Sequence, residues 1–163
     1  MRITFKAIII YSLLFTNMVS ASGNNWSFYS GMFDFSDNGK KSTVIGLQHQ
    51  NENLTRKSFL GTLSPVSGAL ITTDNAAYFY TGVQAQYKIG KFNLTPSFTP
   101  GFYKKGDGKD LGHALEFKSE VQLSLNLFEN SQFGMSYNHI SNASLGDKNP
   151  GANSYVFNFL TKF

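Results

Sequence analysis

The sequence predicts an all-β fold, an eight-stranded antiparallel transmembrane β-barrel of the bacterial outer membrane, and three observations favour it. Apolar and polar residues alternate along many segments, which is the period of a strand with two unlike faces. Long and short connections also alternate, as they do in outer-membrane barrels. The chain begins with a segment typical of a secretory signal peptide and ends on an aromatic residue, Phe163. A soluble β-sandwich would share the alternation and the turns, but the export segment and the aromatic end favour the barrel.

Residues 1–21 have the composition of a signal peptide. Two cations give a basic start, an apolar run follows, and small residues stand at the predicted cleavage site, which ends at Ala21. Asn17 interrupts the run before it reaches the roughly 20 apolar residues that a membrane-spanning helix needs. We therefore expect cleavage after Ala21, which leaves residues 22–163 as one barrel domain.

Composition excludes several classes of site. Loss of the predicted signal peptide removes two cations and no acid, so the formal charge falls from +4 to +2. This balance gives no strong footprint for nucleic acid. The chain has no cysteine, which excludes a disulfide framework, a thiol nucleophile and a thiolate metal site. Packing and backbone pairing must therefore provide the stability.

The predicted strands, in chain order, cover residues 26–36, 41–50, 57–66, 76–88, 91–103, 111–127, 131–141 and 153–163. Several approach the roughly 9 to 11 residues that a tilted strand needs to cross a bilayer. Asn38-Gly39, between the first two, is the signal of a type I′ hairpin turn. The fifth and sixth strands alternate most clearly; their apolar faces include Phe92, Leu94, Phe98, Phe102, Leu115, Phe117, Val121, Leu123 and Leu125.

The predicted connections form two sets. One set, placed at the outer end, covers residues 37–40, 67–75, 104–110 and 142–152. The other set, placed at the inner end, is mostly short and covers residues 51–56, 89–90 and 128–130. Both termini then lie on the periplasmic side, as in outer-membrane barrels.

The last two predicted strands carry polar side chains on an apolar face. Phe133, Met135 and Tyr137 share one face, and counting on by twos reaches His139 and Ser141. In the last strand, Asn153 has the parity of Tyr155 and Phe157. The three polar side chains are expected at the outer end of the barrel, facing lipid. Residues two apart on a strand have Cα atoms roughly 6.5 to 7 Å apart, a gap that an imidazole can span to reach a serine hydroxyl. A polar pair at the headgroup boundary is the other interpretation of the pattern.

The segment His139-Ile140-Ser141-Asn142-Ala143, with Gly146-Asp147-Lys148-Asn149-Pro150-Gly151 after it, resembles the signature of the PagL-type lipid A 3-O-deacylases. These are small outer-membrane barrels, and the resemblance covers about residues 65–163. It implies an esterase that removes a 3-hydroxyacyl chain from lipid A of lipopolysaccharide in the outer leaflet, without a cofactor or metal. It also implies that Ser141 is the nucleophile and His139 the general base. Asn142, Ala143 and Asn149 match family residues near the oxyanion hole.

The sequence departs from the family at Asn153, where a glutamate is usual. An amide can orient a histidine but cannot carry the charge that stabilises imidazolium, and a comparable Asp-to-Asn change in serine proteases lowers turnover by about 10⁴. Two alternatives to the esterase stay open. One is a weak or silent PagL-like barrel that binds lipid, and the other is a structural barrel or adhesin. Pairing of two copies into a homodimer also stays open.

Other charged residues fit this chemistry less well. Asp147 lies in the same predicted outer loop as the serine, whereas Glu116 and Glu120 have the parity of the barrel interior. The Lys104–Lys109 loop brings three lysines to the level of lipopolysaccharide phosphates, although a solvated charged loop is the better explanation of them. His49 and His113 lack visible partners and do not support a metal site.

Overall fold

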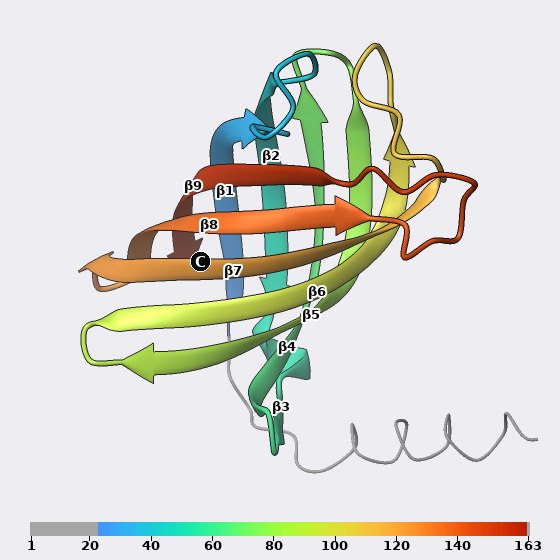
Figure 1. Cartoon of the computed structure of the whole chain (residues 1–163). Coiled ribbons are helices and arrows are strands. Elements are labelled where there is room, and N and C mark those ends of the chain that lie inside the picture. Colours follow the sequence, from blue (N-terminus) through green and yellow to red (C-terminus); the bar gives the residue numbers. More distant parts are fainter. Residues whose placement is uncertain (1–22, 163) are drawn as a thin grey trace, which may run out of the picture.

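The computed structural model describes residues 23–162, and the predicted signal peptide lies outside them. Eight long strands, each antiparallel to its neighbours, run up and down around a closed barrel (Figure 1). They are β1 (Asn24–Phe33), β2 (Ser42–Asn51), β4 (Gly61–Thr72), β5 (Ala77–Ile89), β6 (Phe92–Lys104), β7 (Leu115–Phe128), β8 (Ser131–Ser141) and β9 (Ala152–Lys162). The chain-order neighbours pair with one another, β9 pairs with β1, and β2 pairs with β4. The predicted eight-stranded barrel is therefore confirmed.

The two faces of the barrel are those of a protein that lies in lipid. Outward-facing side chains are large and apolar, and many are about half exposed, such as Phe98 at 48% and Phe157 at 50%. Inward-facing side chains are mostly polar and buried. Lys118, for example, is 1% exposed, with its Nζ 3.6 Å from Glu120 and 4.0 Å from the centre of the Tyr80 ring. The barrel interior also holds a cluster of buried apolar and aromatic side chains, which includes Phe33, Tyr78 and Leu111. A polar interior behind an apolar, lipid-facing surface is typical of outer-membrane barrels.

The third long strand differs from the prediction. The sequence predicts a strand over residues 57–66 and an outer loop over residues 67–75, but β4 covers Gly61–Thr72. Ser67-Gly68 has the composition of a turn, yet both residues lie within β4. A Cβ added at Gly68 would be 2.5 Å from the Tyr80 ring. The glycine thus makes room for a buried aromatic ring instead of turning the chain.

The connection that precedes β4 contains structure of its own. A 3₁₀ turn, η1 (Glu52–Leu54), leads into the short strand β3 (Arg56–Ser58), which pairs with the start of β4. Gly61 has a φ of 92°, which L-residues rarely adopt, and this allows the tight hairpin. Figure 1 shows this hairpin projecting from the end of the barrel opposite the long loops.

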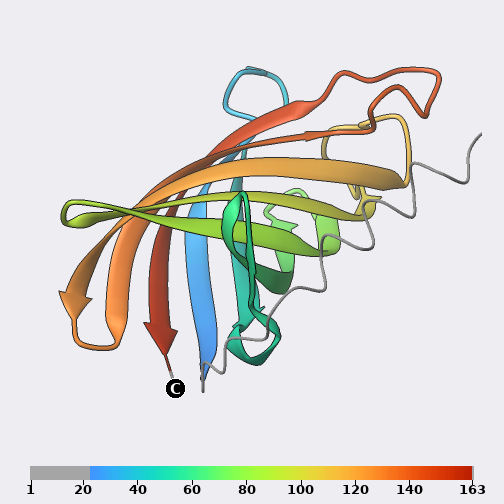
Figure 2. The same cartoon turned by 90° about the horizontal axis from the view of Figure 1, so that it is seen from below.

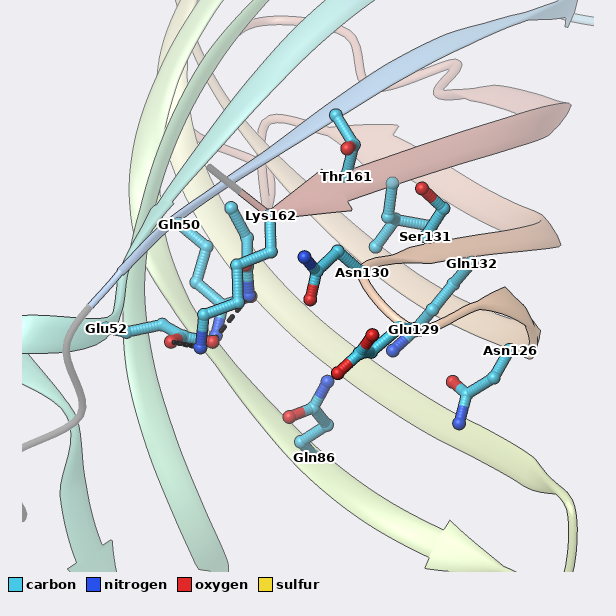
Figure 3. A pocket seen from close by; sticks show the side chains of 12 residues that line it. Gln50, Glu52, Gln86, Asn126, Glu129, Asn130, Ser131, Gln132, Thr161 and Lys162 are labelled. Carbon is cyan, nitrogen blue, oxygen red and sulfur yellow. Dashed lines mark hydrogen bonds and ion pairs between the residues drawn. The ribbon is translucent and has the colours of Figure 1, made fainter.

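The two ends of the barrel differ in length and chemistry. Long connections cover residues 34–41, 105–114 and 142–151 at one end, which we call the outer end. In Figure 2 the 142–151 loop lies beside the 105–114 loop. The inner end holds a polar pocket of about 150 Å³, in which Gln50, Glu52 and Lys162 lie close together (Figure 3). Within it, Lys162 Nζ lies 2.7 Å from Glu52 Oε2, and Asn25 donates a hydrogen bond to the same carboxylate.

Among residues 23–162, no helix is both long and apolar enough to cross a membrane.

Candidate active site

The site begins with a pair of side chains on neighbouring strands at the outer end. His139 of β8 and Asn153 of β9 are direct partners in the antiparallel register. His139 Nδ1 lies 2.8 Å from Asn153 Oδ1, and the Tyr137 hydroxyl donates to the same oxygen at 2.8 Å. Both partners are half-buried, while Tyr137 is 50% exposed on the outward face. The structure therefore brings the predicted base and orienting residue into contact, on the side of the barrel that faces lipid.

Ser141 is the last residue of β8 and lies opposite Phe117 of β7. It shares the outward parity of His139 and is half-buried. Within the described part of the chain, no hydrogen bond joins the Ser141 hydroxyl to His139. The two residues stand two positions apart on one face of β8, where Cα atoms are roughly 6.5 to 7 Å apart. Contacts between a nucleophile and its base often tighten only when substrate binds.

Asn142 has the opposite parity and is fully buried. Its Nδ2 donates to the carbonyl oxygens of Leu111 and Lys148, both at 2.8 Å. Its backbone N–H donates to Asn149 Oδ1 at 3.0 Å. The Asn142 side chain thus supports the outer loops from inside and does not reach the surface where Ser141 lies. Asn149 is exposed; its Oδ1 accepts from Asn142, and its Nδ2 donates to no group among residues 23–162.

The backbone that follows Asn142 is strained. Ala143 and Ser144 have φ values of 52° and 65°, a region that residues with a Cβ rarely adopt. Both are exposed, and the turn is closed by a hydrogen bond from Leu145 N to the Asn142 carbonyl oxygen. Such strain often accompanies functional sites, and here it turns the chain sharply one residue after the predicted support residue.

Gly151 lies directly against the histidine. It has a φ of 62°, and an added Cβ would be 2.7 Å from His139 Cε1 and 3.1 Å from Nε2. Sequence reasoning places this glycine only within the family motif. The structure gives it a physical role, because only a residue without a side chain leaves room for the imidazole.

A three-residue segment between β1 and β2, Asp34–Ser36, completes the site. The Asn153 amide Nδ2 donates to Ser36 Oγ at 3.1 Å, and the Phe35 backbone N–H donates to the Asn153 carbonyl oxygen at 2.9 Å. Asp34 is fully buried, and Lys109 Nζ lies 2.7 Å from its Oδ2. Sequence patterns give no sign of these three residues, because they lie more than 100 positions before Asn153, which they contact.

Phe35 also shapes a groove beside the site. Its ring centre lies 6.2 Å from that of Tyr137 and 5.3 Å from that of Tyr155. The groove has a volume of about 510 Å³ and is almost entirely apolar; it is lined by Phe35, Val121, Leu123, Met135, Ser136, Tyr137 and Tyr155. Tyr137 belongs both to the groove and to the hydrogen bonds around Asn153. An apolar chain lying in the groove would therefore end next to the polar residues.

The other carboxylates lie away from the histidine. Asp147 is exposed in the 142–151 loop, and Glu116 is fully buried inside the barrel, with neither in hydrogen-bonding contact with His139 in the described residues. Glu120 faces Lys118 inside the barrel, as its parity predicts.

The remaining candidates have structural partners. Among the loop lysines, Lys109 turns inward to Asp34 and Asp37, and Lys105 lies 3.7 Å from Asp110. His49 contacts Asn24 and Trp26, and His113 contacts the backbone of Leu115. Within residues 23–162, no group of three or more acidic, histidine or cysteine side chains is placed to hold a metal ion.

Comparison with known proteins decides the family. The model of the family described as lipid A 3-O-deacylase (PagL) matches residues 18–162. The chain belongs to the PagL family. Its barrel is accordingly one of the bacterial outer membrane.

Solved structures share the fold. The outer membrane enzyme PagL superposes with a TM-score of 0.61 at 18% identity, over 84% of this chain and 98% of that one. A de novo designed transmembrane β-barrel has a TM-score of 0.54 at 12% identity, over 90% of this chain and 100% of the design. Neisserial surface protein A has a TM-score of 0.50 at 8% identity, over 86% of this chain and 96% of that one. At these identities the likeness supports the barrel architecture alone.

A curated relative is similar over a shorter stretch. The probable cytochrome P450 518B1 of Dictyostelium discoideum is 24% identical over 90 residues, which are 55% of this chain. The stretch spans 18% of that protein, so the similarity carries no argument about this barrel.

Proposed function

We propose that this chain is an outer-membrane esterase that removes an ester-linked 3-hydroxyacyl chain from lipid A. Membership of the PagL family supports the substrate class. The observation that carries the proposal is the 2.8 Å contact between His139 Nδ1 and Asn153 Oδ1 on the outward face, with Ser141 two residues further along the same strand. A serine and an oriented histidine at the level of the outer leaflet are the groups that ester hydrolysis requires.

In the proposed reaction, Ser141 Oγ attacks the ester carbonyl while His139 Nε2 takes the serine proton. The tetrahedral intermediate collapses as His139 returns that proton to the departing sugar oxygen, which leaves the acyl chain on Ser141. A water molecule, deprotonated by His139, then attacks the acyl-enzyme and releases the 3-hydroxy fatty acid. Each proton that leaves a nucleophile is returned to a leaving group, so the histidine ends the cycle unchanged.

The oxyanion of each intermediate needs hydrogen-bond donors. Asn149 fits this role because its Oδ1 is held by the Asn142 N–H, which leaves Nδ2 to donate. The left-handed turn at Ala143 and Ser144 begins two residues after Ser141, and its backbone N–H groups are further candidate donors. One such donor is typically worth about 10² to 10³ in rate. Asn142 acts in support, since its buried side chain ties the 142–151 loop to the carbonyl oxygen of Leu111.

The apolar groove beside Tyr137 suits the acyl chain that is to be released. Its walls are aromatic and aliphatic, and it opens on the lipid-facing surface. A lipid substrate can enter such a groove without leaving the membrane, so the acyl chain exchanges one apolar environment for another.

The amide at position 153 favours a second candidate, a barrel that keeps the scaffold but does not turn over. An amide lacks the charge that a carboxylate offers to imidazolium, and loss of that charge slows proton transfer. We place the esterase first, because Asn153 still accepts from His139 Nδ1 and so supplies the orienting part of the role.

Mass spectrometry of lipid A, extracted from a lipopolysaccharide-producing strain that expresses the chain, tests the proposal. We expect loss of one hydroxyacyl mass with the native chain and with Ser144→Ala, a matched control in the same exposed turn. Ser141→Ala should leave lipid A intact while the barrel folds normally. Equal product from Ser141→Ala would refute the proposed nucleophile, and intact lipid A with every folded version would favour the silent barrel.

A further inference from the structure

The amide of Asn153 could face His139 with either of its two ends. Its oxygen and nitrogen have nearly the same shape, so the neighbouring hydrogen-bond donors and acceptors decide the orientation. If the oxygen faces His139, the ring carries its proton on Nδ1 and leaves Nε2 free to act as a base. If the nitrogen faces His139, the ring must accept at Nδ1 and carry its proton on Nε2, where it cannot deprotonate a serine.

A buried carboxylate lies at the far end of this hydrogen-bond chain. Ser36 Oγ lies 3.5 Å from Asp34 Oδ1 and accepts a hydrogen bond from Asn153 Nδ2 at 3.1 Å. Asp34 Oδ1 also accepts from the Asn153 backbone N–H at 3.4 Å. Asp34 is thus in contact with Ser36 and with the backbone of Asn153, and its own backbone N–H donates to Ser154 Oγ at 3.3 Å.

The ion pair between Asp34 and Lys109 sets the direction of these hydrogen bonds. Lys109 Nζ lies 2.7 Å from Oδ2, and the Lys109 side chain is only 14% exposed, so the two form a buried ion pair. A carboxylate can only accept hydrogen bonds, which commits the Ser36 proton to Asp34. The serine then offers a lone pair to Asn153, so Nδ2 must face Ser36 and Oδ1 must face His139.

From this geometry we infer that Asp34 is a positioning residue which, through Ser36 and Asn153, holds His139 in the tautomer that has a free Nε2. The inference rests on the proposed esterase for its catalytic meaning, but the tautomer itself is a property of the folded barrel. It explains how a chain with an amide in place of the family's glutamate keeps the histidine oriented. The carboxylate is still present, two hydrogen bonds further away.

Two variants test the direction of the hydrogen bonds from Asp34 through Ser36 to Asn153. In Asp34→Asn the new amide can donate to Ser36, which releases the serine proton toward Asn153 and allows its amide to turn. In Ser36→Ala the link is removed while the Asp34–Lys109 pair stays intact, so this variant remains informative if loss of the buried pair impairs folding. Asp37→Asn is the matched control, because Asp37 also contacts Lys109, at 3.4 Å, but has no hydrogen bond to Ser36 within the described residues.

The first readout is nitrogen-15 NMR of the imidazoles in the detergent-solubilised barrel, with the His139 signal assigned by its loss in His139→Gln. We expect the Nδ1–H tautomer in the native chain and in Asp37→Asn. In Asp34→Asn and Ser36→Ala, we expect the population ratio of the two tautomers to fall by roughly tenfold, which is the net worth of one hydrogen bond. An unchanged His139 tautomer in both folded variants would overturn the inference.

The second readout is the rate of hydroxyacyl release. Asp34→Asn and Ser36→Ala should lower kcat by up to roughly tenfold at nearly constant KM. Neither change should matter in an Asn153→Glu background, where a carboxylate faces the histidine directly; an equal loss in both backgrounds would contradict the inference. If the tautomer shifts in the two variants but the native chain releases no fatty acid, the proposed esterase is refuted and the inference stands. If release depends on Ser141 but the tautomer shifts in neither variant, the inference is refuted and the esterase stands.

Discussion

Gly151 shows how narrowly the histidine is placed at the scale of a single residue. We expect Gly151→Ala to lower the rate of hydroxyacyl release by about 10², because the new Cβ would displace the imidazole by a distance of the order of 1 Å. Kinetics on the purified barrel measure this. Gly90→Ala is the matched control, since Gly90 has a similar φ of 60° but an added Cβ there would have nothing within 4 Å. Equal losses in both variants would mean that backbone strain, not contact with His139, causes the effect.

Some residues of the site could be predicted from the sequence and others could not. His139, Ser141 and Asn153 follow from strand parity and the family motif, because both depend on local spacing. Asp34 and Ser36 leave no such signal. They lie 119 and 117 positions before Asn153, and closure of the barrel between β1 and β9 brings them to it.

At the scale of elements, alternation predicts the strands better than it predicts the turns. The last two predicted strands agree with β8 and β9 almost to the residue, because their outward faces are strongly aromatic. The third strand begins and ends later than the sequence predicts, since Ser67-Gly68 has the composition of a turn. Gly68 makes room for the ring of Tyr80 on the neighbouring strand. From the sequence alone, such a glycine looks the same as a turn glycine, because the strand that pairs with it is not known.

An ion pair between Asp110 and Lys148 joins the 105–114 loop to the 142–151 loop, and this tie should depend on pH. Lys148 Nζ lies 2.9 Å from Asp110 Oδ2, and its hydrogen bond is the main cause that holds the pKa of this exposed carboxyl below its usual 3.8; the Gly112 N–H adds to the effect. A lowered pKa in the folded chain means that the tie is fully present above pH 3.8 and is lost as the pH falls through the lower value.

We therefore expect the tie between the loops to be unchanged between about pH 5 and pH 8 and to be lost on acidification below about pH 3.8. Hydrogen exchange of the Gly112 amide, which donates to Asp110 Oδ1 at 3.0 Å, follows this directly. Asp110→Asn should show the weaker protection already at neutral pH. If acid weakens the protection of the Gly112 amide equally in the native chain and in Asp110→Asn, another titrating group is responsible for the pH dependence.

At the scale of the whole molecule, the apolar outer surface should make stability depend on depth in the membrane. Phe98 lies near the middle of β6 and Phe102 near its outer end, and both face outward. We expect Phe98→Arg to cost about 2 to 4 kcal/mol of unfolding free energy in lipid vesicles, and Phe102→Arg about 0 to 1 kcal/mol. Denaturant titration, with the two alanine variants as controls for lost aromatic area, measures the difference. Equal costs at both positions would contradict this placement of the barrel in the bilayer.

The central claim about the whole barrel is that Ser141 and His139 catalyse ester hydrolysis although residue 153 is an amide. The most direct test is the rate of 3-hydroxy fatty acid release from lipopolysaccharide by the purified native barrel, by Asn153→Ala and by Asn153→Glu. We predict measurable release by the native chain, at least about tenfold less by Asn153→Ala, because one oriented hydrogen bond is lost, and faster release by Asn153→Glu, because the imidazolium gains a charged partner. Release by Asn153→Glu alone would contradict the claim and show that the native barrel keeps the scaffold of the family without its activity.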